Sequence, residues 1–342
     1  MLRMVPLPLR GRIDLDRLTR SIAPMQRLSG IGVTVAGAGA LGLTIAWTLA
    51  RQGAEVTVFD PVPLGDNASG VAAGMLAPAS EALLDAAATP HFRVLMEARD
   101  LWPDLAATLG VPLDRSGALL LGRGEADLAR LREIGAQGHL IHRGLFTLDD
   151  WRLDALAALS ALARAVPVRQ QPVGRPDGIL IVATGAESAD LAPELAALIP
   201  IKGHILRYPG GPAKGPVLRG EGAYIVPDPN GAVAGATMEL GVDDRELDAA
   251  QIAGLRTRVE TILPELADQT PTAAAGVRAA TPDGLPLVGW SAREGVFVAA
   301  GARRNGWLLA PLVARMTAAY LAGEDPGPWA AAMDARRFEE TT

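Results

Sequence analysis

The segment IGVTVAGAGALGLTIAWTLARQGAEVTVFD, residues 31–60, constrains the fold of this chain more than any other feature. Gly37, Gly39 and Gly42 form a GxGxxG pattern between a β-branched run and a stretch with helical spacing. Gly37 permits a tight turn, Gly39 lets backbone approach a pyrophosphate, and Gly42 lets the helix pack against the strand. The pattern therefore predicts a strand, turn and helix that bind a dinucleotide.

An acidic residue follows the glycines at the distance that such a site requires. Asp60 ends the second β-rich run, AEVTVFD, and lies 18 residues after Gly42. An acid at this place accepts both ribose hydroxyls of an adenosine. Ala40 and Leu41 open the helix, whose amide-rich N-terminus faces the phosphates. An ordinary βαβ unit with a glycine-rich turn is the alternative, and the pattern does not separate NAD from FAD.

The composition limits the chemistry that the side chains can carry. The 342 residues include no cysteine, which excludes disulfides, thiolate metal sites and a cysteine nucleophile. The four histidines show no HExxH pattern and form no obvious metal set, so no metal is expected. A formal net charge of -6 without a dense basic run argues against nucleic acid as the main partner. We therefore expect an organic cofactor.

Residues 1–30 carry six arginines and lack the continuous apolar core of a signal peptide, so we interpret them as an N-terminal arm. Residues 31–50 are uncharged and long enough in principle to cross a bilayer. Their β-rich start and glycine breaks fit a strand, a turn and a buried helix better than one spanning helix. We expect no membrane span and a cytoplasmic location.

Small residues follow the acidic position in the segment ASGVAAGMLAP, residues 68–78. Ser69, Ala73 and Gly74 are small enough for backbone to run against a flat ring system, as a bound flavin would need. The alternative is a small-residue loop that packs on a helix. This segment favours FAD over NAD.

Together, GAGALG with Asp60, ASGVAAGMLAP and AAGARRNGWLLAP (299–311) resemble the D-amino-acid oxidase superfamily of FAD enzymes, and within it most the glycine oxidases of thiamine biosynthesis. The resemblance runs from about Ile31 to Phe338. Further matching segments occur in the order that the family shows: IVATGAES (181–188), IKGHILRYP (201–209), AYIVPDPNGAVAGATME (223–239) and AGVRAATPDGLPLVG (275–289). The implied fold is α/β, with an FAD-binding Rossmann-like domain and a second, mainly antiparallel-sheet substrate domain.

The resemblance implies that both domains are discontinuous in the sequence. The residues from 201 to 238 alternate β-branched and polar side chains between turn signals, which independently indicates antiparallel strands. Pockets commonly form between domains, so we expect the reacting site there. The FAD-binding domain would comprise residues 31–85, 147–198 and 275–338, and the substrate domain residues 86–146 and 199–274.

Several segments supply the FAD contacts that the resemblance implies. The adenine contact falls near Val168 or Val173, in a segment that is shorter here than in the family. A helix that begins at Gly306, with Asn305 as its cap, would direct its N-terminus at the flavin C2 carbonyl. Beyond the glycine turn and Asp60, the expected contacts are Ser69, Ala73, Gly74, Met75, Leu76, Val173, Gly185, Arg278, Asn305, Gly306, Trp307 and Leu308.

Flavin oxidation of an amino acid requires that the substrate carboxylate be held, and it requires no general base. The planar fork of an arginine suits the carboxylate. The resemblance places this clamp at Arg304, with Arg303 as a near rival. We interpret Arg278 as an orienting or structural arginine near the flavin. Tyr224 and Met238 match pocket residues, although either could equally be a core residue.

The implied reaction is the oxidative deamination of glycine or a small amino acid by hydride transfer to flavin N5. Its products are a 2-oxo acid, ammonia and hydrogen peroxide, and the imine would serve the thiazole branch of thiamine biosynthesis. The partners are then the amino-acid substrate and oxygen, and a homo-oligomer is left open. The alternatives are a D-amino-acid or secondary-amine dehydrogenase with a non-oxygen acceptor, and a non-catalytic flavin-binding protein.

Overall fold

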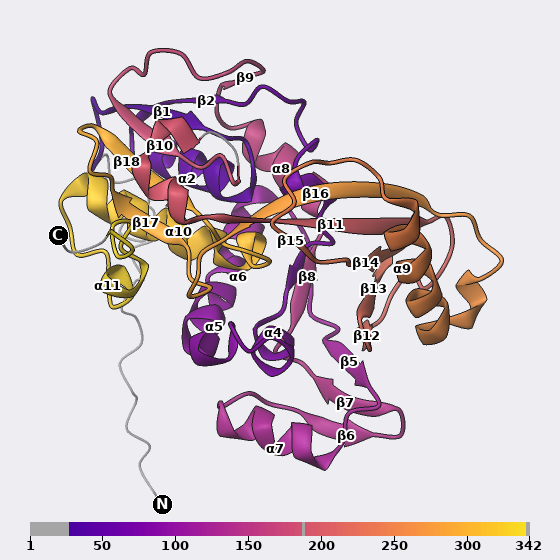
Figure 1. The fold of residues 1–342 in the computed structure, drawn as a ribbon. Coiled ribbons are helices and arrows are strands. Elements are labelled where there is room, and N and C mark those ends of the chain that lie inside the picture. Colours follow the sequence, from indigo (N-terminus) through magenta and orange to yellow (C-terminus); the bar gives the residue numbers. More distant parts are fainter. Residues whose placement is uncertain (1–26, 187–188, 340–342) are drawn as a thin grey trace, which may run out of the picture.

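The computed structural model describes residues 27–186 and 189–339, so nearly all of the expected N-terminal arm lies outside the described residues. A six-stranded sheet forms one part of the molecule (Figure 1). Only β17 and β18 pair in antiparallel fashion in it, and the other strand pairs are parallel. The strand order is β17 (Leu287–Trp290), β18 (Val296–Ala300), β10 (Ile179–Val182), β1 (Gly32–Ala36), β2 (Glu55–Phe59) and β9 (Val168–Arg169).

Helices pack on this sheet and form the largest apolar core with it. They are α2 (Ala40–Arg51), α5 (Phe92–Asp100), α6 (Trp102–Leu109), α8 (Ala155–Ala163) and α10 (Gly306–Ala322). The expected strand, turn, helix and strand over residues 31–60 are confirmed as β1, α2 and β2. Parallel strands covered by helices are buried on both faces, which explains why β1 and β10 consist mainly of apolar residues.

The second sheet has nine strands and confirms the expected antiparallel part of the fold. Only β12 and β5 are parallel neighbours in it, and β16 (Thr272–Ala280) pairs with β11 beside the main path. The path runs β15 (Glu239–Leu240), β11 (Ile199–Tyr208), β14 (Gly231–Gly235), β13 (Ala223–Asp228), β12 (Val217–Gly220), β5 (Ala118–Leu121), β7 (Gly144–Thr147) and β6 (His139–Ile141).

The helices α4 (Pro78–Leu84), α7 (Glu125–Glu133) and α9 (Ala249–Ile262) pack against this sheet. A small third sheet joins β3 (Met75–Leu76), β8 (Trp151–Leu153) and β4 (Leu113–Asp114). The remaining short elements are α3 (Ala68–Val71), α11 (Ala330–Met333), η1 (Thr89–His91), η2 (Ala189–Leu191), η3 (Pro193–Ala197) and η4 (Pro264–Leu266).

The packing bears on where the two domains meet. The helices α5 and α6, which fall in the range 86–146, share the apolar core of the six-stranded sheet. The strand β16, most of which falls in the range 275–338, belongs to the nine-stranded sheet. The exact division of the chain into two domains stays a prediction. The helices α5 and α6 and the strand β16 lie where the two sheets meet.

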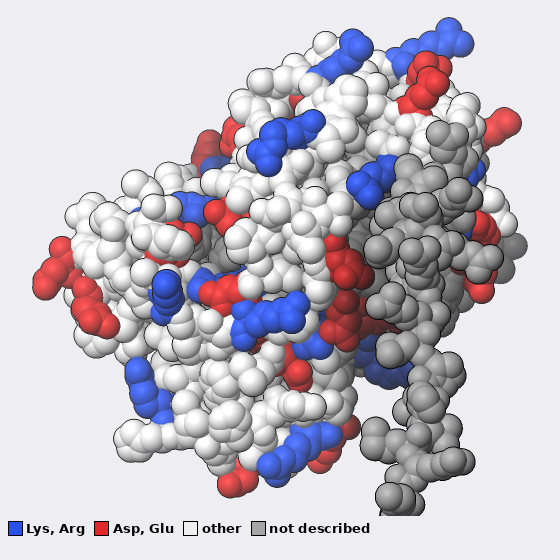
Figure 2. Space-filling model, turned by 180° about the vertical axis from the view of Figure 1, so that it is seen from behind, with Lys and Arg blue, Asp and Glu red and all other residues white. Residues whose placement is uncertain are grey.

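The surface of the described residues agrees with the moderate net charge. The face shown in Figure 2 carries Lys, Arg, Asp and Glu in an interspersed arrangement. None of the helices in residues 27–186 and 189–339 combines the length and the apolarity that crossing a bilayer requires.

A buried tryptophan compensates for a proline inside α10. Pro311 has no N–H, so it cannot donate to the carbonyl of Trp307 one turn earlier. The indole Nε1 of Trp102, which is fully buried, donates to that carbonyl oxygen at 3.0 Å instead. The two indoles also pack with centroids 6.1 Å apart. Trp102 therefore fixes the first turn of α10, which borders the site described below.

We expect Trp102→Phe to lower the free energy of unfolding by about 1–3 kcal/mol, because it leaves the buried Trp307 carbonyl oxygen without a hydrogen-bond donor. Urea unfolding of the holoprotein measures this. Trp290→Phe, at a partly exposed position that makes no such bond among the described residues, is the control and should cost much less. Equal losses in the two variants would contradict the role given to the Trp102 bond.

Candidate active site

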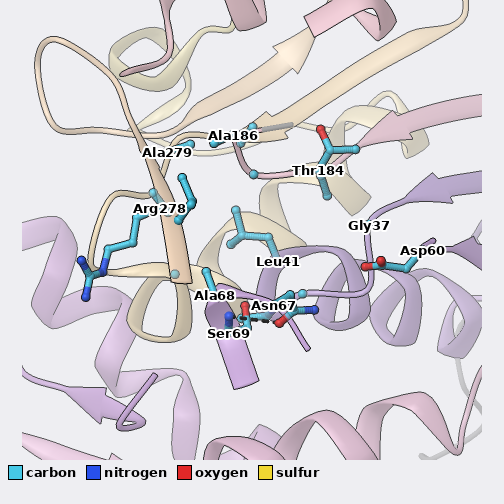
Figure 3. A pocket seen from close by; sticks show the side chains of 18 of the residues that line it. Gly37, Leu41, Asp60, Asn67, Ala68, Ser69, Thr184, Ala186, Arg278 and Ala279 are labelled. Carbon is cyan, nitrogen blue, oxygen red and sulfur yellow. Dashed lines mark hydrogen bonds between the residues drawn. The ribbon is translucent and has the colours of Figure 1, made fainter. Parts of the chain in front are cut away.

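A cavity of about 410 Å³ opens at the carboxyl ends of β1 and β10. Figure 3 shows it as an elongated space, with Gly37 and Asp60 at one end and Arg278 at the other. Thirteen residues singled out in the sequence line it: Gly37, Gly39, Ala40, Leu41, Asp60, Ser69, Val173, Gly185, Arg278, Arg303, Arg304, Gly306 and Trp307. The cavity therefore unites segments that lie up to 270 residues apart in the sequence.

The glycine turn at one end of this cavity leaves no room for larger residues. Gly37 has φ +108, and a Cβ there would lie 2.4 Å from the carbonyl oxygen of Ala183. A Cβ on Gly42 would lie 2.0 Å from the carbonyl oxygen of Gly37. Gly42 does not line the cavity, and it allows α2 to begin directly behind the turn. These contacts agree with the roles that the glycine spacing predicts.

Asp60 supports the same turn with its carboxylate. Its Oδ2 accepts a hydrogen bond from the backbone N of Ala38 at 2.7 Å, and its Oδ1 accepts one from the N of Val62 at 3.1 Å. Asp60 is 9% exposed and lines the cavity. Asp60 thus lies at the end of β2 and orders the glycine turn, and its contact with a ribose stays a prediction.

The segment around α3 packs beside the glycine turn and is hydrogen-bonded to it. The Asn67 side chain caps α3, because its Oδ1 accepts from the backbone N of Ser69 and of Gly70, each at 3.1 Å. Ser69 Oγ in turn accepts from the backbone N of Ala40 at 2.9 Å, at the start of α2. The indole of Trp307 donates to the backbone oxygen of Ser69 at 3.0 Å. These bonds connect the starts of α2, α3 and α10 around one space.

Asn305 occupies the N-cap position of α10, but its side chain makes no capping hydrogen bond there. The expected side-chain cap is therefore wrong, although the helix does begin at Gly306 as predicted. The first two residues of the helix, Gly306 and Trp307, line the cavity, and no side chain of Asn305 caps the backbone N–H groups of the first turn. A helix N-terminus of this kind stabilises negative charge on a bound group.

A second cavity of about 450 Å³ adjoins the first, and both are lined by Ala68, Ala72, Arg278, Arg304 and Trp307. The second cavity extends under the nine-stranded sheet, beside β12, β13 and β14. It brings together several further residues that the sequence predicted: Ala73, Gly74, Met75, Tyr224, Met238 and Asn305. Leu76 and Leu308 line neither cavity, since both are fully buried in the apolar core.

Arg278 lies at the junction of the two cavities and has a buried nitrogen without a partner. It projects from β16, and its Nη1 makes no hydrogen bond to any described residue. Gly203 makes room for the guanidinium, because a Cβ there would lie 2.2 Å from Nη1. Burial lowers the pKa of Arg278, while Tyr224 acts in the opposite direction. A buried cation that lacks a partner favours the arrival of an anion.

Tyr224 faces the same space from β13. A Cβ on Gly235 would lie 2.5 Å from the Tyr224 hydroxyl oxygen, so this glycine makes room for the phenol. Burial raises the pKa of Tyr224, with Arg278 and Arg219 opposing it, which keeps the hydroxyl protonated as a donor. The Tyr224 hydroxyl and the Arg278 guanidinium are therefore two donors at one cavity.

Arg304 reaches the second cavity, but its charge is already paired. Its Nε lies 2.9 Å from Oε2 of Glu81, and its Nη2 also contacts that oxygen. Glu81 is 6% exposed and is also paired with Arg219, whose Nη1 lies 3.3 Å from Oε1. Burial raises the pKa of Glu81, yet Arg304 and Arg219 together hold it below its usual value. The rival candidate Arg303 forms an ion pair with Asp85.

Sequence reasoning missed Glu81, Asp85 and Arg219. Glu81 and Asp85 follow the segment that ends at residue 78, and each is a single acid in an alanine-rich stretch, which is unremarkable in sequence. Their arginine partners lie more than 130 residues away along the chain. One signal in the sequence could have indicated them: the segments assigned to the site contain three arginines, Arg278, Arg303 and Arg304, and buried arginines require acidic partners.

The glycine turn, the acid at the end of β2, the open N-terminus of α10 and the elongated cavity fit a bound FAD. Residues 32–320 match the family described as DAO, FAD dependent oxidoreductase. The chain belongs to this family. It is an enzyme, and FAD is its cofactor. The resemblance read from the sequence is thereby confirmed.

Individual relatives agree with this assignment. The glycine oxidase of Geobacillus kaustophilus is 27% identical, over 84% of this chain and 91% of its own length. A putative thiamine biosynthesis oxidoreductase, ThiO, of Rhizobium etli is 31% identical, over 86% of this chain and 98% of its own length. The crystal structure of the Geobacillus kaustophilus glycine oxidase superposes with a TM-score of 0.79 at 24% identity, and covers 90% of this chain and 98% of that one.

We expect Asp60→Asn to weaken FAD binding by about tenfold or more, because an amide loses the charge-assisted bonds to the turn and to a ribose. Titration of the apoprotein with FAD, followed by flavin fluorescence, measures the Kd. Asp177→Asn removes a carboxylate that is exposed and outside the cavity, and it should leave the Kd unchanged. Unaltered FAD affinity in Asp60→Asn would remove the ribose role.

Proposed function

We propose that this enzyme oxidises glycine or another small amino acid to a 2-oxo acid and ammonia, with oxygen as the electron acceptor and hydrogen peroxide as the reduced product. The observation that carries the proposal is the unpartnered guanidinium of Arg278 beside Tyr224, at the junction of the cofactor cavity and the second cavity. The names of the two sequence relatives support the substrate class and the reaction type.

The substrate carboxylate binds at Arg278 and Tyr224 in this proposal. The guanidinium offers N–H donors in a planar fork, and the phenol offers one O–H donor. Arg304, which the sequence favoured, is less suited because Glu81 already accepts two of its hydrogen bonds. Met238 contacts Arg304, with Sδ and Nη1 3.5 Å apart, and forms part of the cavity wall.

FAD, when bound in the first cavity, would supply the acceptor for the hydride that leaves the substrate α-carbon. The side chains of this chain position the substrate and take little further part. Glu81 is a poor proton acceptor because two arginines hold its pKa below its usual value. In this proposal the amino group therefore loses its proton to water before oxidation. Water then converts the released imine to the 2-oxo acid and ammonia, and oxygen takes up the two electrons and two protons as hydrogen peroxide.

We further propose that the imine of glycine supplies the thiazole branch of thiamine biosynthesis, which the name of the Rhizobium etli relative supports. A dehydrogenase with a non-oxygen acceptor is the rival function. Turnover with an artificial electron acceptor but none with oxygen would favour it over the oxidase.

We expect anaerobic addition of glycine to bleach the visible flavin absorbance of the holoprotein. This result would show hydride acceptance and the substrate class together. Acetate, which has the carboxylate but no amine, is the control and should shift the spectrum without bleaching it. A spectrum that no small amino acid bleaches would contradict the proposed activity.

We expect Arg278→Gln to raise the KM for glycine by roughly 30-fold or more, with FAD still bound, because a buried charge partner of the carboxylate is lost. Arg278→Lys should recover part of this loss. Steady-state peroxide formation measures both variants. Arg293→Gln, which changes an arginine outside both cavities, should keep the wild-type KM. An unchanged KM in Arg278→Gln would return the clamp to Arg304.

A further inference from the structure

We propose that Glu81 determines how many negative charges the substrate carries. Its carboxylate occupies the place between Arg219 and Arg304 that a second substrate carboxylate would otherwise take, and it thereby restricts the enzyme to amino acids with a single carboxylate. The inference rests on the proposed function, and it names a specificity-determining residue for the same cavity.

The geometry around Glu81 is that of a bound carboxylate. Each of its two oxygens faces a different arginine: Oε2 contacts Arg304, and Oε1 lies 3.3 and 3.4 Å from Nη1 and Nη2 of Arg219. Glu81 lies on α4, whereas Arg219 lies on β12 and Arg304 precedes α10. Three separate elements thus converge on one internal anion, which lines the second cavity.

This Arg219–Glu81–Arg304 cluster borders the proposed carboxylate site directly. Arg219 stands opposite Tyr224 in the β12–β13 pair, with its Cζ 5.9 Å from the ring centroid. Arg304 and Arg278 line both cavities. A substrate held at Arg278 and Tyr224 therefore has the cluster beside it, within the same cavity of about 450 Å³.

The charges at this end of the cavity explain the selectivity. With Glu81 present, a second substrate carboxylate would meet a buried like charge in contact with both arginines, which costs several-fold in affinity. Without the Glu81 carboxylate, the guanidinium groups of Arg219 and Arg304 would lose the anion that they share. The Nε of Arg219 is already buried without a hydrogen-bond partner among the described residues. A dicarboxylate would then restore the missing negative charge.

Another buried acid near the cluster does not replace Glu81. Asp150 accepts hydrogen bonds from the backbone N of Ala79 and Ser80 and from the Ser80 hydroxyl. Burial raises its pKa, although Arg219 opposes the shift. Asp150 does not line the second cavity. Glu221 also lines this cavity but is exposed, and Asp85, 3.6 Å from Arg304 Nη2, does not line it. Glu81 is therefore the buried acid of the cavity wall that pairs with both Arg219 and Arg304.

Ligand binding to the oxidised holoenzyme tests the inference without turnover. Acetate and malonate carry one and two carboxylates, and each is titrated while the flavin absorbance is followed. Wild-type enzyme should bind malonate no more tightly than acetate. Glu81→Gln, which is nearly isosteric, should bind malonate at least about tenfold more tightly than wild type and should change much less for acetate. The kcat/KM ratio of D-aspartate to glycine should rise in the same direction.

Two further variants separate selectivity from general disturbance of the protein. Glu81→Gln combined with Arg219→Gln should lose most of the gain for malonate, because one of the two cations is gone. Glu97→Gln removes another arginine-paired glutamate, outside both cavities, and should leave the acetate and malonate affinities at their wild-type values.

An unchanged malonate affinity in folded Glu81→Gln holoenzyme would overturn the inference. Tighter binding of malonate than of acetate by the wild type would also overturn it, and this comparison holds even if the variant does not fold. Failure of the proposed function gives a different pattern: no amino acid bleaches the flavin, while the effect of Glu81→Gln on malonate binding persists.

Discussion

The antiparallel pairing of β11 with β16 is the interaction on which the site depends. It runs over nine residue pairs, from Ile199 opposite Ala280 to Arg207 opposite Thr272. β16 is thereby part of the nine-stranded sheet, yet its carboxyl end meets the loop before α10, where Arg303 N donates to the Ala279 oxygen at 2.7 Å. This strand pair holds Arg278 at the junction of the two cavities.

Glycines make this meeting of elements possible. Gly203 and Gly276 face each other in the β11–β16 pair, and the absence of a side chain at Gly203 leaves room for the Arg278 guanidinium. Gly276 lies under α3, where a Cβ would approach the Cα of Ala68 to 3.1 Å. The same principle operates at Gly37 and Gly42. Close backbone approach at both ends of the cofactor cavity therefore depends on residues without side chains.

Some of the arginines around the second cavity are paired with a carboxylate, and one is not. Arg304 and Arg219 share Glu81, Arg303 has Asp85, and the buried Nη1 of Arg278 has no hydrogen-bond partner among the described residues. Desolvation makes an unpaired buried charge costly, so we expect an anion to bind at Arg278 rather than at the arginines that already have a carboxylate partner. The paired arginines shape the cavity and set its electrostatic preference.

Local patterns in the amino-acid order were sufficient for the strand, turn and helix at residues 31–60, for Asp60, for the antiparallel strands of residues 201–238 and for the helix that begins at Gly306. These features arise from spacing, burial periodicity and backbone freedom within short segments. Tertiary structure decided the pairing of Arg304 with Glu81, the lack of a hydrogen-bond partner for Arg278 Nη1 among the described residues, and the missing side-chain cap at Asn305. Each of these features depends on which groups, far apart in the sequence, come into contact in the low-dielectric interior. The sequence of a single segment does not determine those contacts.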